Sequence, residues 1–217
     1  FLKSLITVSL KVILVLPVLG YWGIQLSGIA ALVASAGVAI GLALQGSLSN
    51  FAGGLVILLI RPFNVGDYVE GAGHNGVIEK IGMFYTHMVS VDNKLILVPN
   101  GTLANGSIVN YSAKELRRVD LTFGVGYEQD ILKVKRVLSN IVEAHDLILK
   151  TPEPFIALSN HGDSAINFVV RVWVNNSDYW KVHFDLLESV KVAFDNEDIS
   201  IPYPQMDLHI KNEGLSK

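Results

Sequence analysis

The feature that most constrains this chain is its first quarter, because residues 12–60 contain no charged side chain. Lys3 and Lys11 are the only charged residues before Arg61. A membrane-spanning helix needs about 20 apolar residues to cross a hydrocarbon core of about 30 Å. Residues 2–60 are long enough for two such spans, whereas the apolar core of a secretory signal has only about 7–15 residues. We therefore predict a membrane part joined to a soluble part.

The composition of the whole chain argues against several functional classes. The net charge of −3 and the lack of a basic run give no reason to expect nucleic acid as a partner. Cysteine is absent, which removes disulfides, thiolate metal sites and a cysteine nucleophile. The six histidines show no zinc-type spacing. We expect no metal and no cofactor.

The membrane part divides into two segments. We expect a transmembrane helix in residues 1–25 and a second helical segment in residues 26–60, which is too long for one straight span. Polar residues and Gly46 interrupt the second segment, and glycine lowers the cost of a sharp bend. The sequence predicts a spanning helix to about residue 44, a kink near Gly46, and a helix over residues 48–60 along the interface. By the positive-inside rule, Lys3, Lys11 and Arg61 place both ends of this membrane part, and the soluble part after it, in the cytoplasm.

The soluble part shows two patterns of secondary structure. Residues 61–115 contain glycines between short β-branched runs, which predicts a cytoplasmic small barrel or sandwich. Its expected strands are residues 68–70, 76–81, 87–91 and 94–98, followed by a turn at residues 98–101. Residues 116–204 predict an α+β domain with strands at 118–125 and 166–174 and helices at 130–146 and 179–194. A last strand is expected at residues 205–210, before a tail that ends at residue 217.

Small residues are unusually frequent in the second apolar segment, and their placement is informative. Each helical residue turns about 100°, so Leu42 lies about 40° from Val38 on the helical wheel. Small side chains lie on both sides of this Val38/Leu42 strip. One edge carries Ala31, Ser35 and Ala39, and the other carries Ala34, Gly37 and Gly41.

Two different small-residue edges favour a ring of subunits over a pair. Small residues let helix backbones approach closely inside a bilayer, and head-to-tail contacts between copies close a ring. The alternative is a helix that packs once, in a dimer or against another span of the same chain, for which one edge is enough. In a ring, the strip with Val38 and Leu42 faces the axis, where apolar side chains gate by dewetting.

Two other motifs resemble catalytic or cofactor sites. The stretch from Gly71 to Gly76 matches G-x-G-x-x-G, but a β-like run follows it where a dinucleotide site needs a helix, so we interpret it as a hairpin loop. Ser159, His161 and Asp163 lie at alternate positions, but adjacency in sequence does not give triad geometry. We predict that the protein is not an enzyme and has no catalytic residues.

Several motifs, in order along nearly the whole chain, resemble the bacterial small-conductance mechanosensitive channel (MscS-type) family. They are Gly41-Leu42-Ala43-Leu44-Gln45-Gly46-Ser47-Leu48-Ser49-Asn50, Arg61-Pro62-Phe63, Gly66-Asp67-Tyr68-Val69, Val98-Pro99-Asn100-Gly101 and Pro202-Tyr203-Pro204-Gln205-Met206-Asp207. The resemblance implies seven identical subunits in the bacterial inner membrane, opened by membrane tension to release ions and small solutes on hypoosmotic shock.

The same resemblance assigns roles to parts of the chain. It implies that residues 1–25 are the second of three transmembrane helices and that residues 26–60 line the pore. Val38 and Leu42 match the two constriction rings, Gly46 matches the kink, and Gly54 matches a further flexible glycine. The soluble part would form a vestibule with side openings, closed by a barrel of one C-terminal strand per subunit.

The sequence also departs from the family pattern. Val38 replaces a larger leucine, Ala34 replaces a glycine and Ser35 replaces an alanine. The family's first transmembrane helix has no counterpart, so we expect a truncated chain. The alternative function that the residues leave open is a membrane-anchored cytoplasmic binding module without conduction.

Overall fold

The computed structural model describes residues 2–22 and 27–209. The chain divides into two compact units, Phe1–Asn110 and Tyr111–Lys217. The first unit contains two apolar helices, α1 (Leu2–Tyr21) and α2 (Ser27–Ile60), and a small β domain. The second unit is a separate α+β domain.

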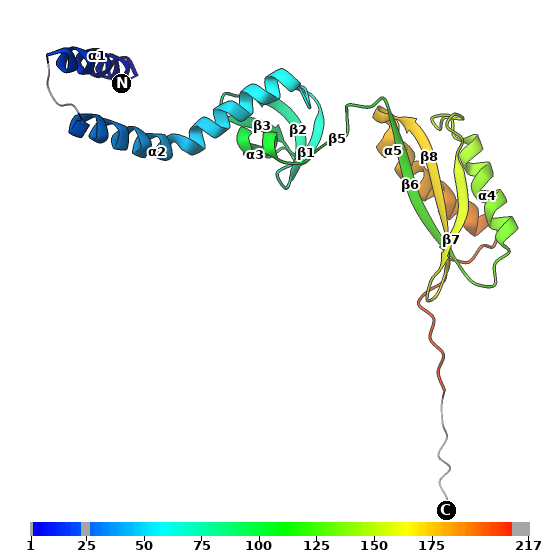
Figure 1. Ribbon diagram of the computed structural model, residues 1–217. Helices are drawn as coiled ribbons and strands as arrows, with labels where there is room; N and C mark the ends of the chain where they lie inside the picture. The colour runs from blue at the N-terminus through cyan, green and yellow to red at the C-terminus, as the bar shows by residue number, and fades with distance from the viewer. Residues whose placement is uncertain (1, 23–26, 210–217) are drawn as a thin grey trace, which may run out of the picture. The chain divides into compact units, whose positions relative to one another are not determined.

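Helix α2 is continuous, which corrects one expectation. The sequence predicted a separate helix over residues 48–60, but the helical backbone runs from Ser27 to Ile60 without a break. Figure 1 shows that its axis changes direction near the middle while the ribbon stays helical. A glycine inside a helix permits bending without removing a backbone donor, as a proline would. The assignment of this bend to Gly46 stays a prediction.

By length and composition, α2 is the one helix within residues 2–22 and 27–209 that is able to cross a membrane. The apolar part of α1, Ile6–Tyr21, is shorter. Both helices are almost wholly exposed on the isolated chain. Their apolar surface therefore needs a covering that residues 2–22 and 27–209 do not supply.

The β domain is a five-stranded antiparallel sheet in the order β4-β3-β2-β1-β5. The strands are β1 (Tyr68–Gly71), β2 (His74–Ile81), β3 (Tyr85–Val89), β4 (Leu95–Pro99) and β5 (Ile108–Asn110). The expected strands are present, although β3 begins and ends two residues earlier than predicted. The sequence missed β5 and the short helix α3 (Asn100–Asn105), where only a turn was expected.

The core of this domain includes a residue from the apolar helix. Ile57 of α2 is 1% exposed, and it lies in one cluster with Phe63 and with buried residues of the strands and α3. Burying a side chain of this size contributes roughly 1.5–3 kcal/mol. The end of α2 is thus part of the β domain in packing terms.

The second unit is a three-stranded antiparallel sheet in the order β6-β8-β7 with two helices on one face. Its strands are β6 (Leu116–Val125), β7 (Phe155–His161) and β8 (Ile166–Asn175), and its helices are α4 (Ile131–Ala144) and α5 (Tyr179–Asn196), the latter preceded by the 3-10 turn η1 (Asn176–Asp178). Figure 1 shows β8 between its two neighbours. The sequence missed β7.

Local chemistry explains where these elements begin and what they bury. Asp130 caps α4 by accepting hydrogen bonds from the backbone N–H groups of Leu132 and Lys133. The predicted core stripe of α5 is confirmed, and its buried residues are Val182, Leu186, Val190 and Phe194. Alternate residues of β8 are buried beneath the helices, as expected for a sheet with one covered face.

The C-terminal segment differs from expectation. A strand was predicted over residues 205–210, but Gln205–His209 form no strand, and residue 210 lies outside the described residues. A strand needs a hydrogen-bonded neighbour, and the part of this chain that the structure describes offers none there. Gln205 is instead held by a hydrogen bond from its backbone N–H to the Ser164 hydroxyl, 3.0 Å long.

Candidate functional site

The first half of α2 is exposed along its whole length. Every residue of the helix from position 27 to position 49 is exposed, including Val38 (63%) and Leu42 (66%). The two residues predicted to form a constriction therefore have no covering partner within the described residues. Their facing a pore stays a prediction.

The small-residue edges of this half are also open. A Cβ atom built on Gly37 or Gly41 would meet no heavy atom within 4 Å, and the same holds for Gly46. The alanines and Ser35 of the two edges are likewise exposed. Packing among the described residues therefore does not account for the small residues at these positions.

The second half of α2 contacts the β domain closely, and glycine makes the contact possible. A Cβ on Gly53 would lie 2.7 Å from the backbone nitrogen of Gly101. A Cβ on Gly54 would lie 2.5 Å from Asn100 Nδ2 and 2.8 Å from the Met83 carbonyl oxygen. The structure thus places the predicted hinge residue Gly54 in a tight contact, and its flexibility stays a prediction.

Two asparagines hold this contact, which we call the α2 dock and define by Asn50, Gly53, Gly54, Asn100 and Gly101. The Asn50 side-chain oxygen accepts a 2.9 Å hydrogen bond from the Gly101 backbone N–H, across 51 positions of sequence. Side-chain acceptors from a distant element satisfy the free N–H groups of a first helical turn. The contact therefore joins α2 to the start of α3.

Asn100 is fully buried and uses both ends of its amide. Its Oδ1 accepts a 2.8 Å hydrogen bond from the Thr86 hydroxyl. Its Nδ2 donates a 2.9 Å hydrogen bond to the Gly82 carbonyl. A buried amide with both ends paired fixes its neighbours, because an unpaired group there would be costly. Asn100 thus sets the loop against which Gly54 packs.

The junction between α2 and the first strand is also fixed. Arg61 adopts a positive φ of 53°, and its backbone N–H still donates to the Ile57 carbonyl at 2.8 Å. Asp67 accepts hydrogen bonds from the Asn64 backbone N–H at 2.8 Å and from the Asn110 side chain at 2.9 Å. The turn after α2 is therefore tied to both β1 and β5.

Sequence reasoning missed most of the α2 dock. It named Gly54 by resemblance and quoted Asn50, Asn100 and Gly101 only as motif letters. The usable signal was the Gly53-Gly54 doublet inside an otherwise apolar helix, because adjacent glycines there often mark a close backbone approach.

The G-x-G-x-x-G stretch is a hairpin loop, as predicted. Gly71 pairs with His74 across β1 and β2, and the two residues between them, Ala72 and Gly73, have φ values of 53° and 76°. Positive φ at both central residues is the geometry of a tight hairpin turn. Asp92 lies in a different hairpin, between β3 and β4. Hydrogen bonds from Lys94, which has the larger effect, and from Ser90 lower the pKa of its carboxyl group.

The serine of the apparent triad is used structurally. The Ser159 hydroxyl lies 3.0 Å from the Asn167 carbonyl and 3.0 Å from the Asn160 side-chain oxygen. The His161 ring stacks on Tyr127, with ring centroids 6.3 Å apart. Across residues 2–22 and 27–209, no group of three metal-ligating side chains comes together.

Comparison with known proteins identifies what this arrangement belongs to. Residues 46–113 match the family model described as mechanosensitive ion channel, β-domain, and residues 119–201 match the model of the mechanosensitive ion channel MscS C-terminal region. The small-conductance mechanosensitive channel of Edwardsiella ictaluri is 44% identical over 210 residues, which cover 97% of this chain and 73% of that protein. The chain belongs to the MscS family of mechanosensitive ion channels.

Solved structures agree with this assignment. The crystal structure of Helicobacter pylori MscS in a closed state superposes with a TM-score of 0.87 at 33% identity, over 95% of this chain and 83% of that one. Arabidopsis thaliana MSL1 matches with a TM-score of 0.77 at 19% identity, over 93% of this chain and 75% of that one, and shows the shared fold. The protein has the MscS fold, and the family and relatives that it matches are channels rather than enzymes.

Proposed function

We propose that this MscS-family chain is one subunit of a homo-oligomeric channel, with seven copies by family resemblance, that membrane tension opens. It would release ions and small solutes after hypoosmotic shock. The observation that carries the proposal is the open first half of α2. Its two small-residue edges and its apolar side chains have no partner within the described residues. Copies of the same helix would supply that partner.

The physical link to tension is lateral area. Membrane tension does work when a protein expands in the membrane plane, so tension favours the state with the larger area. In the narrow state, rings of Val38 and Leu42 exclude water, because an apolar constriction dewets. Sliding of the Gly37/Gly41 edge along a neighbour's Ala/Ser edge would widen the ring and let water return.

The constriction has a direct test. We expect Leu42→Ser to make the pore easier to wet, so that patch recordings under graded suction show a lower threshold and cells leak ions. The matched control is Ile40→Ser, because Ile40 is also exposed and lies about 160° from Val38 on the helical wheel. An unchanged threshold for Leu42→Ser, or equal effects of the two changes, would place the gate elsewhere.

The competing function is an anchored binding module that does not conduct, and it makes the opposite prediction at Gly41. A ring that packs through this edge has no room for an indole, so Gly41→Trp should break the oligomer and abolish conductance. If the variant keeps both its oligomer size and its conductance, the edge is not a packing surface.

We further propose that α1 and α2 both cross the bacterial inner membrane and that residues 61–217 lie in the cytoplasm. Lys3, Lys11 and Arg61 support this orientation by the positive-inside rule. The chain has no cysteine, so single cysteines introduced at the helix connection and on α4 report topology without background. An impermeant thiol reagent outside intact cells should label the first position and leave the second unlabelled. Labelling of the α4 position but not of the helix connection would show the opposite orientation.

A further inference from the structure

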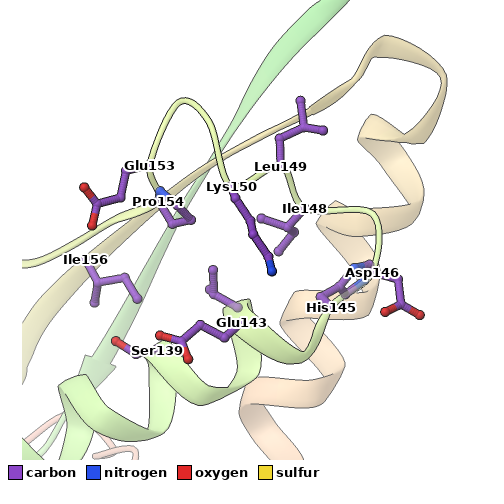
Figure 2. A pocket seen from close by; sticks show the side chains of 11 residues that line it. Ser139, Glu143, His145, Asp146, Ile148, Leu149, Lys150, Glu153, Pro154 and Ile156 are labelled. Atoms are coloured by element: carbon purple, nitrogen blue, oxygen red, sulfur yellow. The ribbon is translucent and has the colours of Figure 1, made fainter.

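The α+β unit contains a concave cavity that the channel function does not use. Its volume is about 750 Å³, and it lies between the end of α4, the loop over residues 145–154 and the start of β7. Figure 2 shows its lining side chains. This volume is within the usual range of small-molecule sites, roughly 300–1,000 Å³.

The loop that forms one wall is held at two points. His145 Nε2 lies 3.2 Å from Asp185 Oδ2 on α5, and His145 Nδ1 accepts a 3.3 Å hydrogen bond from the Leu147 backbone N–H. Nε2 is therefore the nitrogen that carries the proton and donates to Asp185. The pKa of Asp185 is lowered, chiefly by a hydrogen bond from Lys181 and to a smaller extent by one from His145. The carboxylate that accepts the His145 hydrogen bond is therefore ionised.

The second anchor lies four residues further along the loop. The Leu149 backbone N–H donates a 2.9 Å hydrogen bond to the Trp173 carbonyl in β8. With the His145 anchor, this bond fixes residues 145–149, the first half of the wall, to α5 and β8. A wall already fixed before binding costs little ordering entropy when a ligand arrives.

The lining combines an apolar floor with one lysine, Lys150, and three carboxylates, those of Glu143, Asp146 and Glu153. Figure 2 shows the carboxylates of Asp146 and Glu153 directed away from Lys150 and Glu143, which leaves those two opposite charges over the floor. Val142 (4% exposed) and Ile148 (8% exposed) belong to the domain core, and Ile156 packs against them. Figure 2 shows the Lys150 side chain extending from the loop toward α4, where Glu143 lies on the facing turn. Within residues 2–22 and 27–209, neither charge takes part in a salt bridge.

We propose that this cavity binds a small zwitterion with an apolar body, of the class of free aliphatic amino acids. The carboxylate would lie at Lys150, the ammonium group at Glu143, and the alkyl group on Val142, Ile148 and Ile156. Of the four charged side chains of the lining, only Lys150 and Glu143 lie over the floor, and a simple anion or cation pairs one of these two and leaves the other unused. A zwitterion uses both, and its alkyl group covers the apolar floor.

The affinity of such a site is modest. Glu143 and Lys150 are both exposed, and ion pairs in contact with water contribute little each. We expect a dissociation constant on the order of 1 mM for L-leucine. That value suits a ligand that is abundant in the surrounding solution.

The test uses the full chain in lipid nanodiscs with isotopically labelled isoleucine methyl groups. L-leucine should shift the resonances of Ile148 and Ile156 and leave Ile131, at the other end of α4, unchanged. Two analogues separate the charges: isoamylamine lacks the carboxylate and isocaproate lacks the ammonium group. Each should bind about fivefold more weakly than leucine.

Two variants assign the charges to their partners. Lys150→Ala should reduce leucine affinity about fivefold and leave isoamylamine affinity unchanged. Glu143→Gln should also reduce leucine affinity about fivefold, but it should leave isocaproate affinity unchanged. Arg136→Ala, an exposed change on α4 outside the cavity, should alter nothing. Equal affinities for all three ligands, or no shift with leucine, would overturn the proposal, and neither result depends on whether the channel conducts.

Discussion

The two halves of α2 use glycine for different physical reasons. In the first half, a Cβ on Gly37 or Gly41 would meet nothing within 4 Å. In the second half, a Cβ on Gly53 or Gly54 would lie within 3 Å of atoms in the β domain. Contacts within the chain thus explain the glycines of the second half. Contacts among the described residues do not explain the glycines of the first half.

This difference separates the half of α2 whose packing lies within one chain from the half for which we propose packing between copies. The second half of α2 folds against its own β domain, and its geometry is complete in the single chain. The first half carries an equally specific pattern for which the described residues supply no partner, and we propose that other copies supply it. Changes in the second half should therefore alter the stability of one subunit, and changes in the first half should alter assembly and gating.

The largest effect is expected at Gly53. In Gly53→Ala, the new methyl would lie 2.7 Å from the Gly101 nitrogen and 2.8 Å from the Asn100 carbonyl oxygen, and backbone atoms cannot move aside cheaply. We expect a loss of about 3 kcal/mol in the local opening free energy, the upper end for overpacking. Hydrogen exchange of the α3 amides measures it. Gly46→Ala, where the added methyl meets nothing, is the control, and equal losses would remove the distinction between the halves.

A smaller loss is expected at Asn100. Asn100→Ala removes the bonds to the buried Thr86 hydroxyl and the half-buried Gly82 carbonyl and leaves both groups without this partner, which costs about 2 kcal/mol. Asn100→Asp keeps an acceptor for the Thr86 hydroxyl but places a carboxylate against the Gly82 carbonyl, so it should be no more stable than the alanine variant. Hydrogen exchange at the β3 amides distinguishes them, and a fully stable aspartate variant would contradict the assigned bonding.

The sequence predicted the parts of the fold that follow from local pattern. The charge-free stretch predicted the apolar helices, and the four-residue spacing of Val182, Leu186, Val190 and Phe194 predicted the buried face of α5. The hairpin loop over residues 71–76 followed from the β-like run directly after it. In each case the physical cause lies within a few positions of the residues that show it.

The sequence failed where the cause lies far along the chain. The bond between Asn50 and Gly101 spans 51 positions, and no spacing rule links them. Strand β7 is half-buried and irregular near Ser159, so its alternation is weak. The strand expected after residue 204 is absent, because a lone strand has no partner within the described part of the chain. The described part of the chain also supplies no surface that contacts Gly41, so the packing proposed for that edge stays a prediction.

A third change weakens the α2 dock without creating a steric clash. Asn50→Ala removes one hydrogen bond and leaves the N–H of the buried Gly101 without this acceptor. Because Asn50 itself is only half-buried, water can enter the space that its side chain leaves. We expect a loss of about 1 kcal/mol, the usual net value of such a bond. Exchange of the Gly101 amide should rise by about fivefold, while Asn50→Asp, which retains an acceptor, should restore protection. Loss of protection in both variants would show that the bond is not the stabilising element.

The smallest effect on a single subunit is expected at Gly41, and this makes it the strictest test of the comparison. In Gly41→Ala, the added methyl meets nothing within 4 Å, so exchange at the α2 dock should stay within about 0.5 kcal/mol of the parent. If the edge packs against a neighbouring copy, the methyl separates the two backbones, and the solubilised oligomer should dissociate at a lower temperature. Light scattering during heating measures that loss. Faster hydrogen exchange at the α2 dock with an unchanged dissociation temperature would contradict this comparison. Gly41 would then stabilise the fold of one chain rather than the oligomer.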